Sequence, residues 1–223
     1  MKKVFLGLAI AMATGVSAQV DFSSTRFGLT AGVNYSRVRN AHNPSGPIWG
    51  FQAGGLALIP IDSDDQFYIQ PEVLYYTAGE SGKDKDMKGK NGYNAKYANN
   101  YISVPIYFKG YFSEAESEFF GMVGPRFNFL MSQKVTNPAR DYYDPNVVNP
   151  DYPNINGKAN KFNFGIGLGL GYSYKRQVEL SLKYDIGISN TYPNMVEGWT
   201  GDPNTQKRKS EQVLSVGLSY IFE

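Results

Sequence analysis

Apolar residues alternate with polar or small residues over long stretches of this chain, most clearly in FNFGIGLGLGYSY at 162–174. The apolar positions carry Phe, Ile, Leu and Tyr. The intervening positions include Gly165, Gly167, Gly169 and Gly171. A period of two residues is typical of a β-strand and not of a helix. An unbroken apolar face opposite a face of small residues predicts a wall with an apolar solvent outside and a narrow space inside.

The same period recurs in eight segments of the sequence. They are 26–36, 48–59, 66–77, 100–112, 118–132, 162–175, 177–189 and 212–222. Each reaches the length of about 9–11 residues that a tilted strand needs to cross a membrane. An even number of strands allows an antiparallel sheet to close with both termini on one side. The pattern therefore predicts an all-β protein, an eight-stranded antiparallel up-and-down transmembrane β-barrel.

The connections between these segments alternate between short and long. The short ones lie near 60–65, 113–118 and 175–177, and the long ones are 37–47, 78–99, 133–161 and 190–211. Outer-membrane barrels have short periplasmic turns and longer extracellular loops, so we expect both termini in the periplasm. A soluble barrel of the lipocalin kind also alternates apolar and polar residues, but it has no reason to keep its long loops at one end. The loops are rich in Asn, Asp, Gly, Pro and Lys, and we expect them to be solvated and mobile.

Aromatic residues gather near the ends of the expected strands. They are Tyr75, Tyr101, Phe112, Phe119, Phe162, Tyr174 and Phe222. Aromatic girdles at the two membrane interfaces explain this placement, although aromatic residues favour strands in any setting. Three prolines are unexpected in such strands. Pro71, Pro105 and Pro125 each lack the N–H donor of a strand ladder, and a closed barrel has no edge strand at which the donor could be spared. We predict neighbouring bulges at one height, with a break in strand pairing as the alternative.

The N-terminus predicts export. Lys2 and Lys3 precede the apolar run Val4–Val16, and Val16-Ser17-Ala18 has the small residues of a cleavage site. Residues 1–18 thus read as a secretory signal peptide, whose apolar part is shorter than the roughly 20 residues of a transmembrane helix. We expect one barrel domain over 19–223, located in the outer membrane of a Gram-negative cell envelope.

Composition narrows the function classes. The chain has 22 basic and 20 acidic residues, so losing Lys2 and Lys3 would leave a formally neutral protein without the basic surface that nucleic-acid binding requires. The absence of cysteine excludes disulfides, thiol catalysis and cysteine metal sites. Aromatic residues make up 15% of the chain while the mean hydropathy is only −0.38. This pairing is expected where every second strand residue faces lipid.

The alternation also predicts which charged residues face the interior. They are Glu72, Lys109, Arg126, Glu179, Lys183 and Asp185. An eight-stranded barrel is just wide enough for side chains to fill, so these three acids and three bases should form a paired network that plugs it. An ion path or a ligand cradle is the alternative, for which the lumen glycines could make room. On this assignment Leu168→Arg should be costly and Gly167→Ser mild.

No residue pattern indicates catalysis, so we expect no enzyme and no cofactor. His42, the one histidine, lies in the first long loop. The aspartates at 62, 64 and 65 and those at 141, 144 and 151 could bind calcium, but they lack a recognisable ligand spacing, and turn chemistry explains them equally well. The GxGxG run at 165–169 is no dinucleotide fingerprint, because no helix follows it.

Several segments resemble the PorT-type, or porin-like, outer-membrane β-barrel family. They are YIQPEVLYY (68–76), YISVPIYFKGYF (101–112), FFGMVGPRFNF (119–129), FNFGIGLGLGYSY (162–174) and VELSLKYDIGISN (178–190). The resemblance implies an eight-stranded barrel inserted by the barrel-assembly machinery, whose substrates commonly end in an aromatic residue. Here Phe222 is penultimate and Glu223 is last. The resemblance implies no functional residue, although one member of the family takes part in protein secretion.

We therefore expect a monomeric outer-membrane barrel with a plugged interior and extracellular loops that serve interaction or envelope integrity. Outer-membrane lipid and lipopolysaccharide are the expected partners, because many basic residues fall on the outer side. These are Arg37, Arg39, Lys83, Lys85, Lys88, Lys90, Lys96, Lys207, Arg208 and Lys209. Tyr142, Tyr143 and Tyr152 could form an adhesive surface. The alternatives are a small-solute or ion channel, a secretion-accessory barrel, a lipid-modifying barrel enzyme, and a secreted soluble barrel that binds a small ligand.

Overall fold

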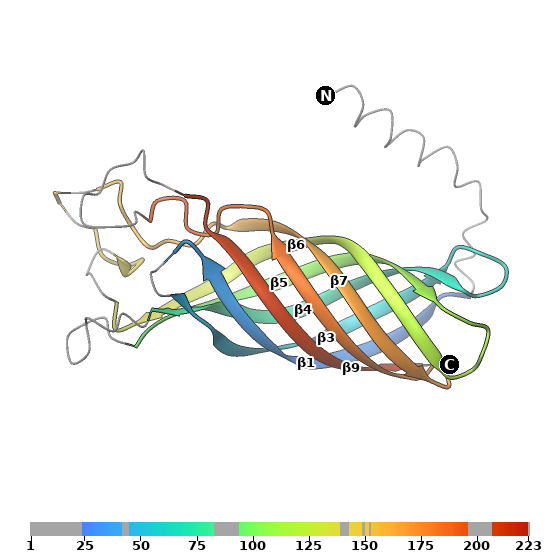
Figure 1. The fold of residues 1–223 in the computed structure, drawn as a ribbon. Coiled ribbons are helices and arrows are strands. Elements are labelled where there is room, and N and C mark those ends of the chain that lie inside the picture. The colour runs from blue at the N-terminus through green and yellow to red at the C-terminus, as the bar shows by residue number, and fades with distance from the viewer. Residues whose placement is uncertain are drawn as a thin grey trace, which may run out of the picture.

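The computed structural model describes residues 24–41, 45–82, 94–138, 143–148, 150–151, 153–195 and 207–222. Residues 1–18, predicted to be a signal peptide, lie outside these ranges, as do His42 and Glu223. The described chain forms eight long strands and one two-residue strand (Figure 1). The strands are β1 (Arg26–Arg39), β2 (Ser45–Gly46), β3 (Ile48–Pro60), β4 (Phe67–Gly82), β5 (Ala95–Tyr111), β6 (Glu118–Thr136), β7 (Phe162–Tyr174), β8 (Val178–Gly187) and β9 (Ser210–Ile221).

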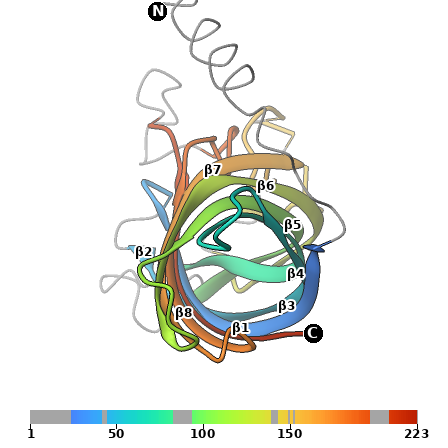
Figure 2. The same ribbon diagram turned by 90° about the vertical axis from the view of Figure 1, so that its right-hand side faces the viewer.

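The eight long strands close into a barrel. Their order is β4-β3-β1-β9-β8-β7-β6-β5, and an additional antiparallel pairing of β4 with β5 completes the ring (Figure 2). The first and last long strands pair from Gly28 opposite Ile221 to Arg39 opposite Ser210. The predicted all-β, eight-stranded antiparallel barrel is confirmed.

The two ends of the barrel differ in their connections. The short connections after β3, β5 and β7 lie together at one end, beside Phe222, and the long connections lie at the other end (Figure 1). The described chain starts and finishes at the same end, where the amide of Phe222 donates to the carbonyl of Phe27 over 2.7 Å. The predicted alternation of short turns and long loops is therefore present.

Three strands extend at least four residues further toward the long-loop end than the sequence pattern predicts. β4 runs to Gly82, β5 starts at Ala95 and β6 runs to Thr136. In this extension Ser81 pairs with Lys96, and Lys96 with Thr136. Small and polar residues dominate here, so the apolar alternation that marks a membrane-crossing strand is absent although backbone pairing continues. Much of the predicted loop 78–99 is consequently a hairpin.

The prolines interrupt strand pairing without the predicted bulges. The β3–β4 ladder is broken next to Pro71, and the β5–β6 ladder is broken next to Pro105 and Pro125. Each ladder resumes in the same register, as expected when a missing N–H donor removes a bond without adding a residue. The one register shift of β5 against β6 lies between Asn100 and Tyr101. The alternative, a break in pairing, is correct.

The wall has an apolar outer face and a mixed inner face. On β7 and β8 the outward residues Ile166, Leu168 and Leu182 are exposed, while the residues between them are buried in the lumen. Most of the predicted girdle residues also point outward. Tyr101 is the exception, because it is fully buried inside and shares the inward phase of Lys109. Its assignment to a girdle was wrong.

Candidate functional site

The lumen holds all six charged residues expected there, joined in three ion pairs. Lys109 Nζ lies 2.6 Å from Glu179 Oε2, and Lys183 Nζ lies 2.7 Å from Glu72 Oε1. Arg126 Nη1 contacts Asp185 Oδ2. None of the six side chains is more than 7% exposed. Each acid thus has one basic partner, and a buried charge without such a partner would be costly.

The strand register explains how the pairs cross the lumen. β8 supplies Glu179, Lys183 and Asp185 from its inward positions, which are separated by even numbers of residues. Their partners come from β6, β5 and β4, which follow β8 and β7 around the ring and face β8 across the lumen. Because successive inward residues of a strand lie at successive heights, the three pairs form three levels along the barrel.

At the level nearest the short turns, aromatic rings surround the ion pair. The hydroxyl of Tyr111 donates to Glu179 Oε1 over 2.6 Å. Lys109 Nζ lies 4.1 Å from the ring centre of Phe120 and 4.8 Å from that of Tyr111. Cation–π contacts and the phenol hydrogen bond offset part of the cost of removing both charges from water.

The middle level consists of Lys183, Glu72 and their neighbours. Lys183 Nζ donates to both carboxylate oxygens of Glu72, at 2.7 and 3.0 Å. Gln70 donates to the same carboxylate over 2.7 Å, and the ring centre of Tyr107 lies 5.0 Å from Lys183 Nζ. These three hydrogen bonds fix the position of the Glu72 carboxylate, so this ion pair is held across the lumen.

The third level has a small cavity beside it. Arg126 Nε donates to Ser103 Oγ over 2.9 Å, and the guanidinium lies over the ring of Tyr76 at 3.9 Å. The cavity has a volume of about 10 Å³ and is lined by Arg126, Asp185, Glu211 and Tyr76, among others. This space is close to the minimum for one water molecule.

Sequence reasoning missed Glu211 and Tyr101 as lumen residues. The hydroxyl of Tyr101 donates to Glu211 Oε2 over 3.4 Å, and both side chains are buried. The alternation of β9 could have revealed Glu211, because it shares the inward phase of Val213 and Ser215. The predicted strand began at 212, one residue after Glu211, and therefore did not include it.

The glycine stripe of β7 accommodates large side chains from neighbouring parts of the wall. A Cβ atom on Gly169 would lie 2.6 Å from Met122 Cγ, and one on Gly171 would lie 2.2 Å from Phe120 Cζ. At Gly167 it would lie 2.7 Å from Asp185 Oδ1 and 2.8 Å from the Tyr107 ring. The space beside these three glycines is therefore filled by neighbouring side chains, which argues against the expectation that Gly167→Ser is mild.

Two long loops cover the long-loop end of the barrel. Tyr143, Ala159, Tyr192 and Met195 are buried in one apolar cluster with residues of the upper wall. The wall residues are Val38, Ala41, Ala95 and Tyr97. We call this cluster the cap. Described parts of the long loops are thus packed, contrary to the expectation of mobile loops, and Tyr143 is not part of an exposed adhesive surface; Tyr142 and Tyr152 lie outside the described residues.

Hydrogen bonds join the cap to the wall. Gln133 donates to the carbonyl of Gly157 over 2.7 Å and accepts from the amide of Ala159 over 2.9 Å. Asn99 donates to the hydroxyl of Tyr192 over 2.9 Å. Burial raises the pKa of the Tyr192 phenol well above its ordinary value, so this hydroxyl remains neutral.

Arg176 ties together the turns at the other end. Its guanidinium donates to Glu118 Oε1 over 2.7 and 2.9 Å and to the carbonyl of Asp65 over 2.9 Å. It lies 4.8 Å from the ring centre of Tyr111, and its own carbonyl accepts from Arg26 over 3.4 Å. The short-turn end is consequently filled by side chains as well.

Two of the aspartates considered for calcium have turn roles. Asp62 accepts from the amides of Gln66 and Phe67, and Asp144 accepts from the amide of Asn146. Within the described ranges, no group of three or more His, Cys, Asp or Glu residues could hold a metal ion. The same ranges contain no helix that is long and apolar enough to cross a membrane.

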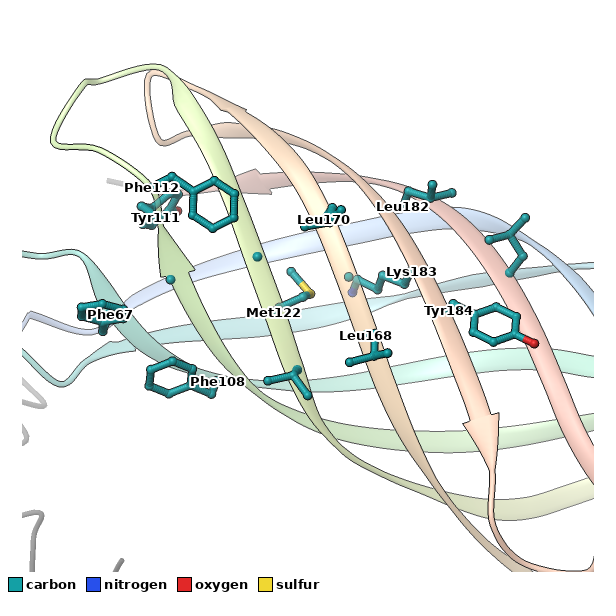
Figure 3. Close-up of a pocket in the computed structure, with 15 residues that line it drawn as sticks. Phe67, Phe108, Tyr111, Phe112, Met122, Leu168, Leu170, Leu182, Lys183 and Tyr184 are labelled. Carbon is teal, nitrogen blue, oxygen red and sulfur yellow. The ribbon is translucent and has the colours of Figure 1, made fainter.

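A groove lies on the outer face of the wall. It has a volume of about 680 Å³ and extends from Phe67 on β4 to Leu214 on β9, with Phe108, Phe112, Leu168 and Leu170 along its length (Figure 3). Gly110 and Gly121 pair with each other in its floor, where the wall carries no side chain. An apolar groove on the face that carries the exposed leucines is suited to hydrocarbon chains.

The solved structures that resemble this one include small outer-membrane barrels. The attachment invasion locus protein Ail of Yersinia pestis, solved with the heparin analogue sucrose octasulfate, is 10% identical, with a TM-score of 0.44 and coverage of 89% of this chain and 99% of Ail. Neisserial surface protein A is 14% identical, with a TM-score of 0.44 and coverage of 88% and 97%. OprG of Pseudomonas aeruginosa is 10% identical, with a TM-score of 0.43 and coverage of 90% and 97%.

No curated protein matches the sequence significantly. One protein family does match. The match covers residues 17–192 of this chain, a range that includes seven of the eight long strands. The description of that family is outer membrane protein beta-barrel domain. The match extends over more than half of the chain, and it agrees with the closed barrel and its apolar outer face. The protein therefore belongs to this family of outer-membrane β-barrels.

Proposed function

We propose that this outer-membrane barrel conducts no ions and acts through its capped extracellular side, in interaction with other molecules or in envelope integrity. The observation that carries the proposal is the filled lumen, with its three levels of buried ion pairs. An ion passing through would have to separate Lys109 from Glu179, Lys183 from Glu72 and Arg126 from Asp185. Separating a buried pair leaves uncompensated charges, which costs several kcal/mol at each level (about 3–5 kcal/mol).

The orientation is part of the same proposal. The short turns and both termini would lie in the periplasm, and the long loops would lie outside the cell, as in other outer-membrane barrels. We also propose that the PorT-type assignment and insertion by the barrel-assembly machinery apply to this chain. The adjacent, exposed rings of Tyr220 and Phe222 support insertion through an aromatic signal at the end of β9. A monomer agrees with the outward apolar face being continuous around the ring.

The distribution of polarity argues against the soluble-barrel alternative. A soluble ligand-binding barrel would place its apolar residues inside and its charges outside. Here Leu29, Leu170 and Leu218 are exposed on the outer face, whereas Lys109 and Arg126 are buried. The six charged side chains of the lumen are engaged in ion pairs with one another, and we propose that the protein is not an enzyme.

Single-channel recording in planar bilayers tests the proposal. The refolded protein, with folding confirmed by heat-modifiable gel mobility, should show no steady conductance. A double variant, Glu72→Ala with Lys183→Ala, removes the middle level while keeping the charge balance, and it should introduce a measurable leak. Leu182→Ala, one residue from Lys183 but on the outer face, is the matched control and should stay closed. Steady ion-selective conductance of the unmodified protein would overturn the proposal in favour of a channel.

A further inference from the structure

Every charged side chain that points outward from a described strand is basic. Arg37 and Arg39 do so on β1, Lys96 on β5 and Lys134 on β6, and all four are exposed. All four lie within a few residues of the long-loop end. Such one-sided placement is informative, because lipid-facing charges are costly near the bilayer centre and cost little at the interface.

Two further basic residues adjoin Arg37 and Arg39. Lys207 and Arg208 are exposed directly before β9, which pairs with β1. Asn40, which follows β1, donates to the carbonyl of Arg208 over 3.1 Å and joins the two segments. We call Arg37, Arg39, Lys207 and Arg208 the basic rim. Lys209, expected on the surface with them, is fully buried, so the expected basic trio is a pair.

The charges of the basic rim are uncompensated within the described part of the chain. The ion pairs there lie in the lumen or, for Arg176 and Glu118, at the short-turn end. None of them includes a residue of the basic rim. Four cations that have no acidic partner among the described residues attract anions from outside the protein.

An aromatic pair fixes the height of the basic rim. Tyr35 and Trp49 lie opposite each other on β1 and β3, both exposed, with ring centres 4.9 Å apart. Aromatic side chains of this kind mark the boundary between hydrocarbon and headgroups. Arg37 is the next outward residue of β1 after Tyr35, so it lies at the level of the headgroups.

The opposite end of the barrel has a different character. Its outward residues Phe27, Phe119 and Phe222 are uncharged, and in its turns the exposed acids Asp64 and Glu116 offset the exposed Lys175. An anionic headgroup is therefore attracted to one rim of the barrel and not to both.

We propose that the basic rim binds the phosphate groups of a phosphorylated glycolipid in the outer leaflet. Two arginines two residues apart on one face can each form paired hydrogen bonds with phosphate oxygens, which a lysine cannot do. The adjoining Tyr35 and Trp49 would pack on the sugar and the upper part of the acyl chains. This inference depends on the outer-membrane location and is independent of whether the lumen conducts.

Trp49 is a natural reporter of this site. On a Trp199→Phe background it is the one remaining tryptophan, since the chain has two. The protein is folded into vesicles of brominated phosphatidylcholine, which quenches exposed Trp49. Unbrominated diphosphoryl lipid A is then added, and the recovery of fluorescence gives its enrichment at Trp49 relative to its mole fraction. Dephosphorylated lipid A and free inorganic phosphate are measured in parallel.

We expect diphosphoryl lipid A to be enriched roughly fivefold or more, the effect of about one basic residue at a membrane surface. The Arg37→Gln, Arg39→Gln double variant should lose this enrichment, while Lys175→Gln at the opposite end should retain it. Both variants should keep heat-modifiable mobility, which separates a binding defect from misfolding. Since the vesicles are symmetric, the direction of insertion does not affect the result.

Three outcomes would overturn the inference. Equal enrichment of dephosphorylated lipid A would assign the effect to acyl-chain packing. Retention of enrichment in the double variant would exclude the arginines. A recovery with inorganic phosphate alone as large as that with lipid A would mean that free anions, and not a lipid, are the ligand.

Discussion

The two faces of the wall are built by different rules, and β7 shows the difference within one strand. Its outward residues Ile166, Leu168 and Leu170 are exposed on the apolar outer face and need only be apolar. Its inward residues are glycines because particular atoms lie close by, such as Phe120 beside Gly171. The outer face is specified by residue class, and the inner face is specified by shape and charge, residue by residue.

This difference explains why the lumen is the more demanding half of the sequence. An outward leucine can be exchanged for another apolar residue without altering a neighbour. An inward residue such as Lys109 has a carboxylate partner, a nearby phenol and an aromatic ring, all buried. Substitutions on the two faces should therefore change the free energy of unfolding in different ways. Three substitutions should show this difference, with effects that decrease from the first to the third.

The largest effect is expected when one partner of a lumen pair is removed. Lys109→Ala leaves Glu179 buried with only the Tyr111 hydroxyl, and it should lower the free energy of unfolding by about 3–5 kcal/mol. Urea titration of the protein in lipid vesicles, followed by tryptophan fluorescence, measures this change. Lys109→Met combined with Glu179→Leu should recover most of the loss. If the double variant were as unstable as the single one, packing and not charge pairing would govern this level.

A charge on the outer face should be the next most costly change. Leu168→Arg places a cation in the hydrocarbon region, and it should cost about 2–4 kcal/mol of folding free energy. Leu168→Phe is the control and should change stability little, because only residue class matters there. The same urea titration measures both variants. An equally large loss for Leu168→Phe would contradict the rule that separates the faces.

The smallest of the three effects should come from one added methyl group in the lumen. Gly167→Ala brings a Cβ within 3 Å of Asp185 and Tyr107 and, as overpacking, should cost about 1–3 kcal/mol. Gly217→Ala is matched, because it also faces the lumen but its nearest atom would be Ser181 Oγ at 3.2 Å. A change below about 0.5 kcal/mol is expected there. Equal stability of the two variants would show that the glycine stripe has spare room.

Much of the fold could be predicted because lipid imposes a simple rule on the sequence. The apolar alternation of the eight segments located the long strands, and the loop lengths located the two ends. Upper β4 and β5 escaped the pattern because polar residues there face water on the outside, where alternation is not required. Tyr101 was misplaced because nearness to a strand end was given more weight than its phase relative to Lys109.

The candidate site could be predicted in membership but not in detail. The inward phase identifies Glu72, Lys183 and the other four charges, whereas their partners depend on which strands lie across the ring from each other. The steric role of Gly167 depends on Tyr107, a residue 60 positions earlier in the sequence. Contacts of this kind follow from the closed register, which local patterns do not contain.

The seam between β1 and β9 has a consequence for how the protein is made. Twelve residue pairs join the first strand to the last, across almost the whole length of the chain. Because β9 follows the other strands in the sequence, a chain without it leaves one edge of β1 and one edge of β8 unpaired, and such free edges invite aggregation. Pairing over such a separation is slow, so closure of the barrel depends on the most distant contact in the described chain. A stop codon that removes β9 thus opens two edges at once and turns a stable barrel into a substrate for proteolysis.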